Sequence, residues 1–507
     1  MRYLFILILL PLCSLAKKNI LFISVDDLKP SLGVYGDNYA ITPHIDKLAS
    51  FGTTFTNAHV QQAICAPSRV SLLTGLRPDL TEVWDLETQM RDKNPNILTL
   101  PQYFKENGYS TVGMGKIFDN RSVDRKLDQR SWSQPYIKVE VNHSIHGNSI
   151  TGFQSPENKK ILTQIRDKAS EDGIPQGRMW QYLRSKFKPS IESFDISDDG
   201  YTDGVITLAA VSQLSKLSEK DDPFFLAVGF VKPHLPFVAP KKYLDMYPIS
   251  NIKLTEIKKH PLNGYNKAIR TGGELKSYYG MPEFYNEIDD SLALKLRRAY
   301  YACISYADAQ VGKLLDKLNE LDIRDKTIVV LWGDHGYKLG DYNSWCKWTN
   351  MHLDTNIPLI FSIPNGKKNS VSRSPIAALD IYPTLVELNG MQKPKHLEGQ
   401  SIVSLLNNPD IFKERVVYSI WPISRQDYKK TIMGYAAKTE RYNYIEWIRM
   451  NSGHKVGMEF FDRLKDPYET VNLVEDSQYT ETIAFLSEKL SERINNTDHN
   501  HAFKKID

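Results

Sequence analysis

The segment CAPSRVSLLTG, residues 65–75, places a cysteine and an arginine at a spacing suited to nucleophilic chemistry on an anion. Pro67 can begin a helix that Gly75 ends, so Cys65 would lie at the helix N-terminus, where free N–H groups and the helix dipole favour an anion. Arg69 follows one turn later and could point its planar guanidinium at a tetrahedral oxyanion. A buried cysteine before a helix is the alternative interpretation, but it gives Arg69 no role. The segment therefore predicts a nucleophile beside an anion site.

Two polar pairs with acidic residues follow apolar runs elsewhere in the chain. Asp26 and Asp27 follow NILFISV, and Asp334 and His335 follow KTIVVLWG. Three carboxylates brought together would repel one another, and a hard divalent cation such as Ca²⁺ or Mg²⁺ would relieve that repulsion. A helix cap or an exposed turn explains adjacent acids equally well, because both are common after strands. The pairs alone leave both interpretations open.

These residues need strands that deliver them to one place. Four apolar runs are expected to be buried strands of a parallel sheet covered by helices. They are the two runs above, YSTVGMG before Lys116 and PFFLAVGFVKP before His234. In open α/β sheets ligands bind beyond the carboxyl ends of the strands, so the four polar ends should meet. Helices are expected over 43–52, with Thr42 as the N-cap, and over 292–321.

The pattern changes at about residue 400. RVVYSIWPI, TIMGYAAK and RYNYIEWIRM are short, aromatic and β-branched, which predicts a small antiparallel sheet with a final amphipathic helix over 481–494 packed on it. The segment 126–200 is rich in Ser, Asn, Asp and Lys and is interpreted as insertions and loops over the main sheet. We therefore expect a catalytic domain over 17–400 and a C-terminal subdomain over 401–507.

Composition excludes some classes of protein and predicts export. The chain has 507 residues and a net charge of +4 spread along it, so it has no basic stripe for nucleic acid. Residues 1–16, MRYLFILILLPLCSLA, predict a cleaved secretory signal peptide. The alternative is a lipoprotein anchored through Cys13. No later segment is apolar enough to be transmembrane.

Three cysteines remain once the signal peptide is removed: Cys65, Cys303 and Cys346. This is an odd number for an exported protein. Cys303 is interpreted as a buried helical thiol, and Cys346 is left undecided.

CAPSR followed by LLTG resembles the signature of the type I sulfatases, in which the cysteine is oxidised to formylglycine. The resemblance covers nearly the whole mature chain and looks closest to iduronate-2-sulfatases. It includes ISVDDL, TPHIDKLASFG, GMGKIF, VKPHLPF, WGDHGYKLGD and FFDRLKDPYETVNL. It implies an α/β fold with an alkaline-phosphatase-like core, in which a mixed, mostly parallel sheet lies between helices. It also implies a smaller C-terminal domain with a short antiparallel sheet.

The resemblance also implies a role for each matching residue. Arg69 and Lys116 would hold and polarise the sulfate and the formylglycine. His234 would protonate the leaving alcohol oxygen, and Lys347 would contact sulfate or a substrate carboxylate. One Ca²⁺ would be bound by Asp26, Asp27, the modified Cys65, Asp334 and His335.

The implied function is hydrolysis of sulfate esters on a sulfated, uronate-containing polysaccharide or oligosaccharide, as part of glycan degradation. Lys347 lies between Trp345 and Trp348, which suits a carboxylated sugar that stacks on an aromatic face while its charge is paired. A formylglycine-generating enzyme or an anaerobic maturase is the implied partner during export. We expect a secreted protein of the bacterial periplasm, with an extracellular or lysosomal location as the alternative.

One position departs from the family pattern. The arrangement GK-x-x-H would place at 119 a histidine that supports the formylglycine hydroxyl, but this chain has Asp119, a weaker base near neutral pH. His44 or His59 could supply the missing group, although each is more simply interpreted as a helix or surface residue. Two other functions stay open. They are an inactive sulfatase-like protein that binds sulfated glycan, and a phosphoesterase on the same core, which would favour a Ser or Thr nucleophile and a second metal.

Overall fold

The computed structural model describes residues 17–141, 144, 152–270, 273–424, 427 and 430–496. The expected signal peptide, with the alternative through Cys13, lies outside the described residues. The main sheet has eight strands in the order β11-β2-β10-β7-β1-β5-β3, with β12 beside β2. In chain order they are β1 (Asn19–Val25), β2 (Thr53–His59), β3 (Ser110–Gly115), β5 (Phe224–Phe230), β7 (Thr327–Gly333), β10 (Asn356–Ser362), β11 (Ser370–Ser372) and β12 (Ile376–Ala377).

The centre of this sheet is parallel and one half of it contains an antiparallel strand. β1 pairs in parallel with both β5 and β7, and β3 pairs in parallel with β5. β10 is antiparallel to β2 and to β7. The four predicted strands are all present, and the sheet is mixed and mostly parallel, so the expected fold class is confirmed.

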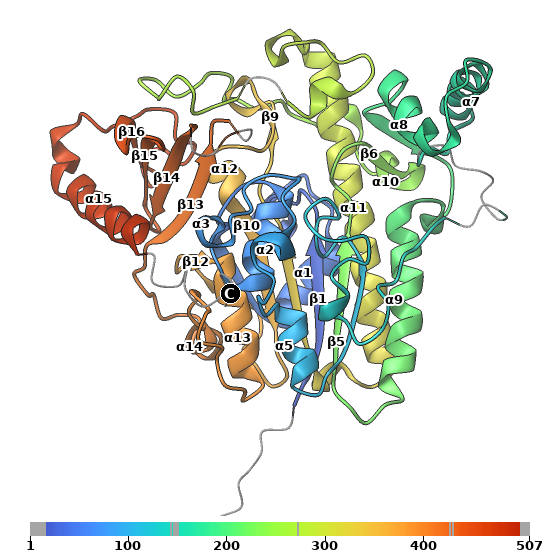
Figure 1. Cartoon of the computed structure of the whole chain (residues 1–507), viewed down its shortest axis with the longest axis horizontal. Helices are drawn as coiled ribbons and strands as arrows, with labels where there is room; N and C mark the ends of the chain where they lie inside the picture. Colours follow the sequence, from blue (N-terminus) through green and yellow to red (C-terminus); the bar gives the residue numbers. More distant parts are fainter. Residues whose placement is uncertain are drawn as a thin grey trace, which may run out of the picture.

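Side chains of β1 alternate between two hydrophobic cores, because successive residues of a strand point to opposite faces. Leu21, Ile23 and Val25 belong to one core, and Ile20 and Phe22 belong to the other. The first core is covered by α1 (Pro43–Ser50), α9 (Thr202–Ser218) and α11 (Asp290–Glu320). The second is covered by α2 (Cys65–Thr74), α5 (Leu100–Glu106) and α13 (Ile381–Leu388). The sheet is thus sandwiched between two helical layers (Figure 1).

The C-terminal part forms a four-stranded antiparallel sheet beside this core. Its strands pair in chain order, and α15 (Thr480–Asn495) packs on its outer side (Figure 1). The strands are β13 (Val417–Pro422), β14 (Ile432–Lys438), β15 (Tyr442–Arg449) and β16 (His454–Asp462). The sequence did not predict β16, because its first five residues, HKVGM, form no apolar run and none of them is buried. The domain boundary at 400 stays a prediction.

The interpretation of 126–200 as insertions and loops was wrong for part of that segment. It contains α7 (Pro156–Glu171), α8 (Gln176–Lys186) and β4 (Ile191–Phe194), which pairs with β6 (Phe237–Pro240). Each of α7 and α8 buries only two residues, so its apolar stripe is too narrow to stand out in a polar sequence.

The shorter elements of the fold are α3 (Pro78–Thr81), α4 (Met90–Lys93), α10 (Lys241–Asp245), α12 (His352–Thr355), α14 (Val403–Asn407), β8 (Lys338–Leu339) and β9 (Trp345–Cys346). Within the described ranges, no helix has both the length and the apolar character needed to cross a membrane.

Candidate active site

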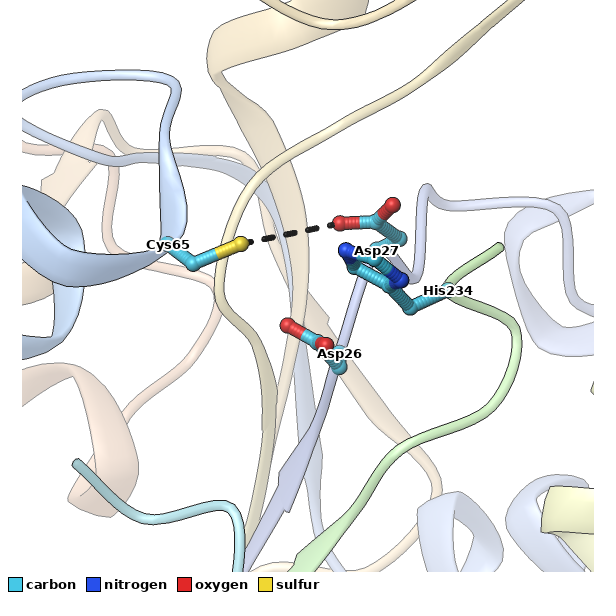
Figure 2. A group of neighbouring side chains, drawn as sticks. All are labelled: Asp26, Asp27, Cys65 and His234. Atoms are coloured by element: carbon cyan, nitrogen blue, oxygen red, sulfur yellow. Dashed lines mark hydrogen bonds between the residues drawn. The ribbon is translucent and has the colours of Figure 1, made fainter. Parts of the chain in front are cut away.

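The polar residues that follow four parallel strands meet at one edge of the sheet. Asp26 and Asp27 follow β1, Lys116 follows β3, His234 follows β5 and Asp334 follows β7. The Asp27 backbone N–H donates to Asp334 Oδ1 at 2.9 Å, and Lys116 Nζ lies 2.5 Å from Asp26 Oδ2. Figure 2 shows the Asp26 and Asp27 carboxylates and the His234 ring grouped near Cys65. The predicted convergence of these strand ends is confirmed.

Cys65 is the first residue of α2, which ends at Gly75 in the left-handed conformation, as the sequence predicted. Its Sγ lies 3.4 Å from His335 Nε2 and 4.0 Å from Asp27 Oδ1, the contact marked in Figure 2. Burial raises the pKa of the Cys65 thiol well above its usual value, so the encoded side chain is a neutral thiol. A neutral buried thiol is a poor nucleophile, although it lies at the centre of the charged cluster.

Two overlapping sets of ligand atoms around Cys65 could hold a cation. Within each set the ligand atoms lie within 4.8 Å of one another. One set is Asp26, Asp27, Cys65 and His234, and the other is Cys65, Asp334 and His335. Together they contain all five predicted calcium ligands. His234 is the additional member of the cluster.

Arg69 lies beneath the carboxylates, which differs from the predicted orientation. Its Nε donates to Asp334 Oδ2 at 2.9 Å and its Nη2 to Asp26 Oδ1 at 3.1 Å. Its Nη1 donates to Ser24 Oγ at 2.8 Å and to the carbonyls of Lys116 and Ile117, and the side chain is 0% exposed. The guanidinium fork therefore holds two carboxylates in place instead of pointing towards an oxyanion.

Lys116 is shared between Asp26 and Asp119. Its Nζ lies 3.6 Å from Asp119 Oδ2, and the side chain is 17% exposed. Asp119 is buried and accepts from Arg121 at Nε (2.8 Å) and Nη2 (2.7 Å). Although burial alone would raise the pKa of Asp119, the Arg121 hydrogen bonds and the Lys116 charge hold it well below its usual range. This agrees with the prediction that the aspartate is a weak base.

Lys347 and His234 are linked by Glu274, a residue that the sequence did not single out. Lys347 Nζ lies 2.8 Å from both oxygens of Asp27 and 3.0 Å from Glu274 Oε2. His234 Nε2 lies 3.0 Å from Glu274 Oε1, and its Nδ1 lies 2.5 Å from the Leu235 carbonyl oxygen. Glu274 follows no strand, and the surrounding sequence GGELKS gives no signal of a site.

The tryptophans on either side of Lys347 do not offer free aromatic faces. Trp345 is 3% exposed and belongs to a core that also contains residues of α11. Trp348 is 7% exposed and belongs to a core that also contains Trp421 and Trp447. The expectation that a sugar stacks on them is therefore wrong for this conformation, because protein atoms already cover both rings. The structure keeps Lys347 at the site and buries both indoles.

The remaining candidates lie away from the cluster. His59 hydrogen-bonds Asn57 and Thr355, and His44 packs against Gly312 of α11, so each imidazole is used elsewhere in the fold. Cys303 is a free, buried thiol in α11, as predicted, and Cys346 is also free and buried. Neither histidine takes the place of the one missing at 119.

Comparison with known proteins gives consistent matches. The family model described as Sulfatase matches residues 18–391, and the model described as N-sulphoglucosamine sulphohydrolase, C-terminal, matches 340–496. Iduronate 2-sulfatase from Homo sapiens is 32% identical, over 91% of this chain and 92% of that protein. The solved structure of a 2-O GAG sulfatase superposes with a TM-score of 0.69 at 22% identity, over 97% of this chain and 95% of that chain. The structure of a phosphonate monoester hydrolase from Silicibacter pomeroyi also superposes with a TM-score of 0.69, at 20% identity, over 96% of this chain and 97% of that chain. At such identities the two structural matches establish the fold alone.

Proposed function

Since the chain belongs to the sulfatase family, we propose that it hydrolyses sulfate esters on a sulfated, uronate-containing polysaccharide or oligosaccharide, with a formylglycine made from Cys65 as the nucleophile. The chain is a sulfuric ester hydrolase. The observation that carries the proposal is the position of Cys65, at the N-terminus of α2 and in contact with His335 and Asp27. The helix N-terminus would favour an anion bound at the side chain that replaces the thiol.

The formylglycine proposal rests on the segment CAPSR and on the need for a second hydroxyl. Hydrated, the aldehyde would offer one hydroxyl to attack sulfur and keep another whose collapse releases sulfate. A thiol has no such second group. Conversion requires a formylglycine-generating enzyme or an anaerobic maturase, and we place it during export to the periplasm.

The donor set around residue 65 fits a calcium ion. Three buried carboxylates from two strand ends lie with an imidazole around a single side chain, and hard oxygen ligands of this kind favour Ca²⁺. The ion would be held by Asp26, Asp27, Asp334, His335 and the residue at 65. Bound there, it would supply positive charge that stabilises oxyanions at residue 65 and on the sulfate.

The protein's own side chains have three kinds of role in this proposal. Arg69 is a positioning residue, because it acts through the two carboxylates that it holds. Lys116 and Lys347 place ammonium groups at the site, where they would stabilise charge on the sulfate oxygens. His234 would give its Nε2 proton to the leaving alcohol oxygen, since the ring belongs to the cluster and its Nδ1 is bound to a backbone carbonyl.

Support for an anionic glycan comes from basic residues around the site. Lys188 interacts electrostatically with Glu274 and Arg184, and its ammonium lies 3.6 Å from the centre of the Tyr278 ring. Arg121 is half-exposed and interacts electrostatically with Cys65. These cations could pair with carboxylates or further sulfates of the glycan. The relative named iduronate 2-sulfatase agrees with such a substrate.

The test is to determine both the modification and the substrate. Mass spectrometry of the peptide containing residue 65 is expected to find formylglycine when the protein is made with a converting enzyme. Sulfate release is then measured with sulfated, uronate-containing oligosaccharides, with steroid sulfates and with a phosphonate monoester. Preferential release from the oligosaccharides is expected. A fully active preparation with only unmodified Cys65 would contradict the nucleophile, and equal turnover of steroid sulfates would contradict the substrate class.

A further inference from the structure

Glu274 joins two side chains that are expected to act on the ester, His234 and Lys347. One carboxylate oxygen lies 3.0 Å from His234 Nε2, and the other lies 3.0 Å from Lys347 Nζ. The side chain is 18% exposed, so it lies between the buried cluster and solvent. Burial alone would raise the pKa of Glu274, but Lys347 and His234 hold it well below its usual range, so it is a carboxylate.

The loop that carries Glu274 is fixed against the segment that carries Lys347. A Cβ atom added at Gly273 would lie 1.9 Å from Cζ3 of Trp348, so only glycine allows the two segments to approach this closely. The Arg270 guanidinium lies 5.2 Å from the Trp348 ring centre on the same loop. Cys346 and Trp348 both have positive φ, 68° and 89°, a conformation that is retained when surrounding contacts determine it.

The contacts of the two His234 ring nitrogens indicate how Glu274 positions the ring. Both ring nitrogens face acceptors, the Leu235 carbonyl oxygen at Nδ1 and the Glu274 carboxylate at Nε2. A proton on each nitrogen would let the ring donate to both acceptors, and the Nε2 proton is the one that a general acid would transfer. One ring nitrogen of His234 belongs to the group of ligand atoms that lie within 4.8 Å of one another, together with Cys65 Sγ and the carboxylates of Asp26 and Asp27.

We propose that Glu274 is a positioning residue for cleavage of the ester, which holds the protonated Nε2 of His234 and the Nζ of Lys347 together on the leaving-group side of residue 65. The proposal rests on the function proposed above and adds to it. As the hydroxyl oxygen of residue 65 bonds to sulfur, its proton passes to the neighbouring Asp27 carboxylate. The bond from sulfur to the alcohol oxygen breaks, and its electron pair stays on that oxygen. The oxygen takes the Nε2 proton, which leaves His234 neutral, and Glu274 remains a carboxylate throughout.

The dependence of the rate on the leaving group tests this role. Acid assistance matters most for a poor leaving group such as a sugar alcohol, and little for 4-nitrophenol, which leaves as a stable anion. For Glu274→Gln we expect kcat toward a sulfated oligosaccharide to fall by about 10²-fold, the lower end of general-acid effects. The loss toward 4-nitrophenyl sulfate should be less than about 5-fold, because the nucleophile and the other charges remain.

Two further variants separate positioning from damage to the fold. Glu287→Gln makes the same change of charge outside the cluster, in the short helix Tyr285–Glu287 that precedes α11, and it should leave both rates unchanged. Gly273→Ala keeps Glu274 but forces its loop away from Trp348, and it should reproduce the selective loss toward the oligosaccharide. Each variant is compared with wild type by thermal unfolding and by its formylglycine content.

Equal losses toward the two substrates in Glu274→Gln, or no loss toward either, would overturn the proposal. If fully converted wild-type protein hydrolyses neither sulfate, the proposed function itself fails, and this outcome is seen before any variant is made. A selective loss in Glu274→Gln and Gly273→Ala, with unchanged rates in Glu287→Gln, supports the positioning role.

Discussion

Replacing Asp119 with histidine should accelerate the release of sulfate from the enzyme. Free aspartate has a pKa of about 3.9 against about 6.5 for histidine. In this site Arg121 and Lys116 hold the pKa of Asp119 still lower, against the effect of burial. The carboxylate is therefore a poor acceptor for the proton that must leave residue 65 when sulfate is expelled. The wild-type enzyme should transfer sulfate readily and release it slowly.

The size of the effect follows from the contacts at 119. General-base assistance is worth about 10² to 10⁴-fold in rate, but Lys116, 3.6 Å away, also lowers the basicity of an imidazole there. We therefore expect Asp119→His to raise the rate of sulfate release by about 10- to 100-fold, below the full range. The variant loses the paired hydrogen bonds from Arg121. Because Arg121 is half-exposed and can turn to water, the loss of stability should be about 1–2 kcal/mol.

Pre-steady-state kinetics with 4-nitrophenyl sulfate measure the two steps separately. Wild type should show a burst of nitrophenol followed by slow turnover, and the burst should shrink in Asp119→His as the second step becomes faster. Asp119→Asn is the matched control, because it keeps the size of the side chain but has neither the charge nor a basic group. If Asp119→His releases sulfate no faster than Asp119→Asn, the reasoning from basicity is wrong. A fully converted wild type with no burst, no sulfated enzyme and no turnover of a glycan panel would favour an inactive glycan-binding protein.

Three other predictions follow from the same site. Cys65→Ala should abolish turnover and leave the melting temperature unchanged. Cys65→Ser should stop after the first step as a sulfated protein, visible by mass spectrometry, because serine has no second hydroxyl. Turnover by either variant would contradict this prediction. Exhaustive chelation should remove activity and added Ca²⁺ should restore it, whereas full activity of the chelated protein would exclude a required ion. Burial and the Arg184 charge lower the pKa of Lys188 to about 8, so Lys188 loses its positive charge above that pH. KM for an anionic oligosaccharide should therefore rise above about pH 8, and Lys188→Gln should abolish this rise.

The residues at the strand ends could be predicted because two simple rules determine their positions. A parallel strand is a short apolar run, and the residues after it lie at the carboxyl edge of the sheet. Asp26, Lys116, His234 and Asp334 all follow such runs, and the structure brings them together. Cys65 was predictable for a related reason, since Gly75 ends its helix and Pro67 lies in the first turn, two residues after the helix begins.

Other features depend on packing that no local pattern encodes. Glu274 reaches the site from a loop whose approach depends on the contact of Gly273 with Trp348, far away in the sequence. Arg69 could be placed one turn from Cys65, but whether its fork faces an oxyanion or carboxylates depends on how deeply α2 is inserted beside β1 and β7. Burial of Trp345 likewise follows from the position of α11, which the spacing of residues 345–348 does not reveal.

Positive and negative side chains alternate along the site, and this alternation explains how the site accommodates the negative charge of Asp119. Arg69 joins two carboxylates, Lys116 joins Asp26 to Asp119, and Arg121 follows at the half-exposed outer end. Buried ion pairs add little net stability compared with apolar side chains, so such a series is better explained by preorganised charge for catalysis. A carboxylate in place of the family's histidine adds a negative charge beside Lys116. Arg121 balances that charge through two hydrogen bonds, so Lys116 still contacts Asp26. The exchange therefore removes a base without breaking the charge pairing around residue 65, as expected for a slower enzyme that keeps its nucleophile and electrostatics.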